Sequence, residues 1–154
     1  MLFRSLDDFA AAHGAPNAFG LVGFDANAPG PNKRPLSSMT PTIVLKNGKP
    51  FLVTGSPGGS RIITVVLQVL LNAIDHGMPI AAAVQTPRIH HQWLPDEVMV
   101  EAGIAPAAVT ALEARGHRVT VRPPLSSANS IMVTPDGFVG AADTRTRGAL
   151  AAGY

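Results

Sequence analysis

Residues 42–76 constrain the fold of this chain more than any other part of the sequence. The stretch 42–54, TIVLKNGKPFLVT, has β-rich runs on both sides of Asn47-Gly48, which is the strongest short signal for a hairpin. A turn containing Gly58-Gly59 follows, and apolar residues then cover nearly every face of a helix predicted from about residue 60 to 76. A helix of this kind needs cover on more than one side, so we expect it to be buried between layers.

The other periodic segments predict a mixed α+β fold of one domain, in which helices cover mostly antiparallel sheets. The predicted helices lie at about 80–85 and 105–115, and the predicted strands at 98–101, 117–122, 130–133 and 138–142. The turn at residues 134–137, TPDG, joins the last two strands as a second hairpin. We find no internal repeat and no domain boundary.

Several classes of function are disfavoured by composition. The net charge is +2 without a run of like charges, so a nucleic-acid partner is not expected. The chain has no cysteine, which excludes disulfides and thiolate sites within it. Its longest apolar stretch, residues 62–74, is too short and interrupted for a membrane span. No carboxylate stands at ligand spacing from the five histidines, so we expect neither a metal nor a cofactor.

Three local features could bind a ligand. Free N–H groups at the Gly58-Gly59 turn could bind an anion or a developing oxyanion, although a tight turn without ligand is also possible. Ser37 and Ser38 could donate to a carboxylate or merely cap a turn. Asp7 and Asp8 could hold a cationic amine or cap a helix at residues 9–12. Residues 6–41 are rich in proline and glycine but too apolar for a free linker, so we expect an ordered, functional loop.

Taken together, these segments resemble the γ-glutamyltranspeptidase family, also called the glutathione hydrolases. The resemblance covers residues 6–154 and rests on several long motifs in the right order. These motifs are LDDF at 6–9, GPNKRPLSSMTP at 30–41, TGSPGGSRII at 54–63, PRIHHQWLP at 87–95 and AAGY at 151–154.

The resemblance implies an N-terminal-nucleophile hydrolase fold, an αββα sandwich of two stacked sheets between helical layers. It also implies a precursor that cuts itself into a large and a small subunit, with this chain similar to the C-terminal part of the small one. The substrates would be glutathione and other γ-glutamyl compounds, and the acceptors water, amino acids or peptides. No cofactor is implied, and the family resemblance suggests a periplasmic or secreted enzyme.

The family's functional residues can be carried over where the motifs match. Asp8 resembles the carboxylate that binds the α-amino group of the glutamyl moiety. Ser37 and Ser38 resemble the pair that binds its α-carboxylate. Gly58 and Gly59 resemble the residues whose backbone N–H groups form the oxyanion hole.

The sequence also departs from the family pattern. The nucleophilic threonine and the first small-subunit strands belong upstream of residue 6, so we expect the isolated chain to be inactive. Met1–Ser5 do not fit the family, and residues 2–5, LFRS, are what one frame of the sequencing adapter CTCTTCCGATCT encodes. These five residues are therefore interpreted as possible adapter-derived sequence. The alternatives are a non-catalytic glutamyl-binding remnant and a related self-processing acylase that acts on β-lactam side chains.

Overall fold

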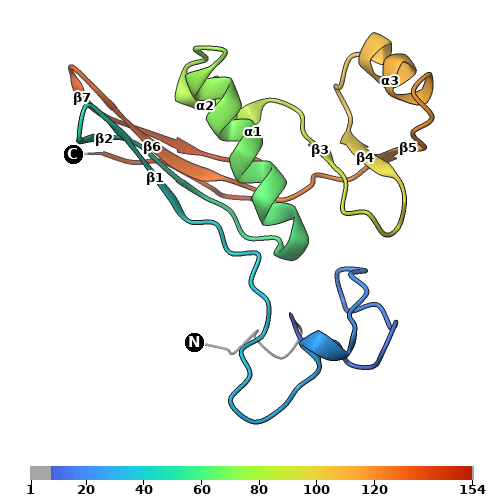
Figure 1. Ribbon diagram of the computed structural model, residues 1–154. Helices are drawn as coiled ribbons and strands as arrows, with labels where there is room; N and C mark the ends of the chain where they lie inside the picture. The colour runs from blue at the N-terminus through green and yellow to red at the C-terminus, as the bar shows by residue number, and fades with distance from the viewer. Residues whose placement is uncertain (1–7, 154) are drawn as a thin grey trace.

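The predicted 42–54 hairpin forms one edge of a four-stranded sheet in the computed structural model, which describes residues 8–153 (Figure 1). The sheet is antiparallel throughout, in the order β1-β2-β6-β7. Its strands are β1 (Thr42–Lys46), β2 (Lys49–Gly55), β6 (Asn129–Thr134) and β7 (Gly137–Ala142). Both hairpins are confirmed, and the central pairing of β2 with β6 joins them into one sheet.

A smaller sheet has the order β3-β4-β5, and its strands are β3 (Ile89–His90), β4 (Val98–Glu101) and β5 (Val119–Arg122). β4 pairs antiparallel with β3 and parallel with β5. The parallel pair is joined through helix α3 (Pro106–Glu113), because parallel neighbours need a crossover connection. The α+β class is thus confirmed, with mainly antiparallel pairing.

Helices α1 (Ile62–Ile74) and α2 (Ile80–Gln85) cover one face of the large sheet (Figure 1). The last turn before α1 is a short 3-10 helix, Gly59–Arg61. The apolar part of the core between helices and sheet consists of Leu52, Val65, Val69, Ala73, Ile80, Ala83, Val84, Ala128 and Ala141. The hydroxyls of Thr54 and Ser130, which are 2.8 Å apart, are also buried in this sheet.

The expectation that α1 is buried between layers is only half met within residues 8–153. Its sheet side is buried, but Ile63 and Leu67 on the other side are 51% and 50% exposed. The second face of the large sheet is open too, since the cross-strand row Ile43, Val53 and Ile131 is exposed. One layer of helices contacts one sheet here, so an apolar surface remains on each outer side.

The segment from residue 8 to 41 is an irregular loop that folds back on itself and contains a short 3-10 helix at Asp25–Asn27. The helix considered as an alternative at residues 9–12 does not form. The Ala10 amide donates to the Asn27 carbonyl (3.0 Å) and the Gly14 amide to the Gly23 carbonyl (2.9 Å), so these groups pair across the loop instead. Met1–Ser5 and Asp7 lie outside the described residues.

Candidate functional site

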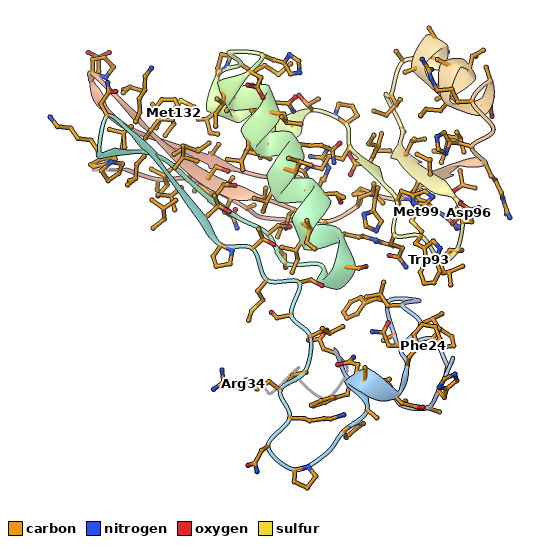
Figure 2. The ribbon with its side chains drawn as sticks, in the orientation of Figure 1. Phe24, Arg34, Trp93, Asp96, Met99 and Met132 are labelled. Atoms are coloured by element: carbon orange, nitrogen blue, oxygen red, sulfur yellow. The ribbon has the colours of Figure 1, made fainter. Side chains whose placement is uncertain are left out.

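The structure brings Asp8, Ser37 and Ser38 to one cavity of about 360 Å³, although they are about thirty residues apart in sequence. Apolar side chains form most of the rest of its wall, among them Leu21 and Phe24, of which Phe24 is labelled in Figure 2. One carboxylate and two hydroxyls are complementary to the ammonium and carboxylate of an amino acid. The cavity therefore suits an amino-acid head group.

This cavity depends on the way the loop closes on itself. The Asn27 side-chain amide donates to the Asp8 carbonyl (2.7 Å), which holds the backbone of Asp8 in place. Gly23 allows the closest approach, because a Cβ there would overlap Ala10 and lie 2.9 Å from its Cα. Beside the cavity, Ser37 Oγ accepts from the Met39 amide at 3.3 Å, which leaves the Ser37 hydroxyl proton free to donate.

The turn between β2 and α1 has the backbone geometry that only glycine adopts without strain. Gly58 has φ +126° and Gly59 has φ +58°. A Cβ on Gly58 would lie 2.6 Å from Ser126 Oγ, and one on Gly59 would overlap the Phe19 ring. Within residues 8–153 the amides of Gly58 and Gly59 donate to no other group. Two adjacent N–H groups of this kind can bind an anionic oxygen.

Two neighbours of this turn were not predicted from sequence. Phe19 comes from the N-terminal loop, and its ring packs against Gly59. Ser126 precedes β6, has φ +122°, and donates its hydroxyl to the Pro57 carbonyl. Neither contact has a local sequence signal, because both join segments that are far apart along the chain.

A buried network of four charged side chains lies behind the turn, and sequence reasoning missed it as well. Arg88 and Asp143 pair at 2.7 Å with exposures of 1% and 0%. Arg145 pairs with Glu101 at 2.5 Å and with Asp143 at 3.1 Å. Arg88 also donates to the Ser126 carbonyl at 3.0 Å, so the network reaches the segment that contacts Gly58.

The two acids of the network are ionised because their partners outweigh burial. Burial by itself raises the pKa of Glu101, but Arg145 and the amides of Leu125 and Arg88 hold it below the usual range. Burial likewise acts against the charge of Asp143, while the Arg145 amide and the Arg88 guanidinium lower its pKa overall. The network therefore stabilises the fold as charged pairs.

A second cavity, of about 390 Å³, has Phe19 and Gly20 of the N-terminal loop in its wall. It is lined partly by Arg61, Glu97 and Arg122. Glu97 is paired with Arg122 at 2.6 Å, which holds the pKa of this carboxyl below its usual range. The lining therefore combines this ion pair and the Arg61 guanidinium with apolar side chains such as Phe19 and Met99.

Residues 8–153 contain no group of three His, Asp or Glu side chains arranged to hold a metal ion. None of the helices in this range is both long and apolar enough to cross a membrane. His90, one of the histidines considered as a ligand, is instead buried and bonded to Thr64 and Gln92.

Comparison with known proteins places this arrangement in a family. The family model described as gamma-glutamyltranspeptidase matches residues 1–153. The chain belongs to the γ-glutamyltranspeptidase family. The glutathione hydrolase proenzyme of Escherichia coli K12 is 58% identical over 155 residues, which span 100% of this chain and 27% of the relative.

Solved γ-glutamyltranspeptidases have the same fold. An acivicin-inhibited γ-glutamyltranspeptidase superposes with a TM-score of 0.89 at 51% identity, over 96% of this chain and 81% of the other. The T380A mutant of the Helicobacter pylori γ-glutamyltranspeptidase gives 0.88 at 50% identity, over 95% and 81%. These neighbours confirm the fold class expected from the sequence motifs. The chain spans about a quarter of the length of the E. coli relative.

Proposed function

We propose that this chain is the part of a γ-glutamyltranspeptidase that recognises the glutamyl group and stabilises the reacting carbonyl. The observation that carries the proposal is the cavity shared by Asp8, Ser37 and Ser38. Asp8 binds the α-ammonium group, and Ser37 and Ser38 bind the α-carboxylate, through charge-assisted hydrogen bonds. The substrates are glutathione and other γ-glutamyl compounds.

The amides of Gly58 and Gly59 form the oxyanion hole in this proposal. Their N–H groups donate to the oxygen that becomes negative when the γ-carbonyl is attacked, and such donors are pre-aligned by the backbone. A threonine nucleophile from outside these residues attacks and forms a γ-glutamyl ester as the C–N bond breaks and the donor's amine leaves with a proton. Water, an amino acid or a peptide amine then takes the glutamyl group and frees the threonine. The large subunit of the same precursor completes the enzyme.

Two open apolar surfaces support the proposed partner. The outer side of α1 and the outer row of the large sheet expose Ile63, Leu67, Ile43 and Ile131. Contiguous exposed apolar patches mark surfaces that other protein covers. We assign this cover to the remaining small-subunit strands and the large subunit. A periplasmic or secreted location is proposed on family membership alone.

A chimera tests the function with this chain's own residues. Residues 6–154 replace the matching stretch of the E. coli relative, to which the chain is 58% identical. We expect the chimera to cut itself into two subunits and to hydrolyse a γ-glutamyl anilide. Asp8→Asn should abolish turnover, whereas Asp136→Asn at the exposed β6–β7 turn should not.

The alternatives predict other outcomes of the same experiment. A cleaved chimera that binds glutamate in calorimetry without turnover would refute catalysis and favour a binding remnant. Turnover of a β-lactam side-chain amide in place of the γ-glutamyl anilide would favour the acylase.

A further inference from the structure

One side chain, Gln92, contacts both sides of the Gly59 turn. Its Oε1 accepts from the Ser60 hydroxyl at 2.8 Å, directly after Gly59. Its Nε2 donates to the carbonyls of Phe19 at 2.9 Å and Leu94 at 3.0 Å. The Phe19 ring in turn packs on Gly59. Gln92 therefore links Ser60, in the 3-10 turn, to the loop that covers this turn.

The orientation of the Gln92 amide is determined by its partners. Two carbonyl oxygens face one end, so this end must be the NH₂ group, because an oxygen there would be repelled. The other end faces the Ser60 hydroxyl and His90 Nε2, which lies 3.0 Å from Oε1. Only a glutamine in this orientation satisfies all four groups.

His90 contacts the Oε1 end of Gln92 and connects it to α1. Its Nδ1 lies 2.8 Å from Thr64 Oγ1 on α1, and its ring is 2% exposed. Burial lowers the pKa of His90, so the ring is neutral near pH 7 and its single N–H can donate to Gln92 Oε1. The chain Thr64–His90–Gln92–Ser60 thus starts and ends on the same helical segment.

The loop that Gln92 holds has internal order of its own. The Asn17 side chain accepts from the amides of Phe19 (2.9 Å) and Leu21 (3.0 Å). The Gly20 amide donates to the Asn17 carbonyl at 2.9 Å. Fixing the Phe19 carbonyl therefore fixes the whole short loop, and with it the ring that packs on Gly59.

We propose that Gln92 is a positioning residue for the oxyanion turn, and that it acts by holding Ser60 on one side of Gly59 and Phe19 on the other. The inference rests on the proposed function of Gly58 and Gly59. Gln92 lines the second cavity and is absent from the wall of the head-group cavity, so its effect should fall on the chemical step rather than on glutamyl binding.

Two variants of Gln92 in the chimera test this role. Gln92→Leu removes every hydrogen bond of the side chain. Gln92→Glu keeps an acceptor for Ser60 and His90 but turns an oxygen toward the Phe19 and Leu94 carbonyls. The matched control is Gln85→Leu, because Gln85 also bridges two segments, donating to the Ala142 carbonyl (3.2 Å) and accepting from Thr144 (2.7 Å), away from the turn.

Kinetics and hydrogen exchange are the two readouts. For both Gln92 variants we expect kcat to fall about tenfold or more, with KM for the γ-glutamyl donor within about threefold. The amides of residues 19–21 should exchange faster than in the parent. Gln85→Leu should change neither kcat nor this exchange, which separates positioning from a general loss of stability.

Unchanged kcat in both Gln92 variants would overturn the inference, and so would a loss seen equally with Gln85→Leu. If Gln92→Leu does not fold, Gln92→Glu alone decides between these results. An inactive parent chimera would refute the proposed function instead. In that case unchanged exchange at residues 19–21 would still overturn the role of Gln92, and faster exchange would support the link between Gln92 and the loop.

Discussion

Substituting Gly59 by alanine should remove most of the activity without removing substrate binding. Gly59 has φ +58°, where an L-residue costs about 1–2 kcal/mol. The new Cβ would also overlap the Phe19 ring, with Cζ only 2.6 Å away. Carbon atoms prefer about 3.5–4.0 Å, so the ring or the turn must move by about 1 Å. A movement of this size misaligns the Gly59 amide.

The expected magnitude follows from the loss of one oxyanion donor, which costs about 10²–10³-fold in kcat. KM for the donor should stay within about threefold, because Asp8, Ser37 and Ser38 line a cavity that does not include Gly59. The assay is release of the anilide from a γ-glutamyl anilide by the processed chimera, normalised to the cleaved fraction on a gel.

Gly77→Ala is the matched control. Gly77 has φ +63° but no atom within 4 Å of the position a Cβ would take, so it carries the same backbone strain without the overlap. It should lower Tm by a few degrees and leave kcat unchanged. If Gly59→Ala retains kcat within about threefold of the parent, the assignment of the turn as an oxyanion hole is refuted.

The remaining predictions concern recognition, stability and assembly. Ser38→Ala should raise KM for the donor about tenfold or more with little change in Tm, measured by steady-state kinetics. Asp143→Ala leaves the Arg88 guanidinium buried without its partner and should destabilise the fold by about 3–5 kcal/mol, measured by denaturant unfolding. Because the pKa values of Glu101 and Asp143 are lowered in the folded state, their stabilisation is present above the unfolded pKa and is lost as pH falls through the folded pKa. Tm should therefore drop below about pH 4, less steeply in Glu101→Gln. Leu67→Glu on the open side of α1 should reduce assembly of the two subunits on size exclusion.

Sequence reasoning succeeded where structure is determined locally. The Asn47-Gly48 turn and the alternation around residues 134–137 sufficed for both hairpins. The helix after Gly58-Gly59 was predicted to within two residues at each end, since its apolar run begins and stops sharply.

Long-range pairings had no comparable signal. The bond between Thr54 and Ser130 joins residues 76 apart, and the Arg88–Asp143 pair joins residues 55 apart. Nothing in the spacing of either pair reveals its partner. The N-terminal loop was expected to be ordered, but its cross-loop pairings, such as the Ala10 amide with the Asn27 carbonyl, could not be predicted from the sequence.

The candidate site was predictable only in part, and for the same reason. The Gly58-Gly59 turn is a local motif, so its chemistry could be argued from the residues alone. That Asp8 and Ser37-Ser38 share a cavity could be expected only from the resemblance to a family. The role of Gln92 could not be predicted, because it depends on three segments that meet only in the fold.

Because the chain is synthesised from its N-terminus, the buried charge network affects when the chain can fold during synthesis. Arg88 and Glu101 emerge from the ribosome before Asp143 and Arg145, which follow the last strand. Until residue 145 is made, the site of the network holds a guanidinium and a carboxylate that lack their main counterions, an arrangement that strongly disfavours burial. The residues around the network can therefore become buried favourably only once residues 143–145 have been made. A product truncated before residue 143 should be recognised by proteases as unfolded rather than accumulate as a nearly complete domain.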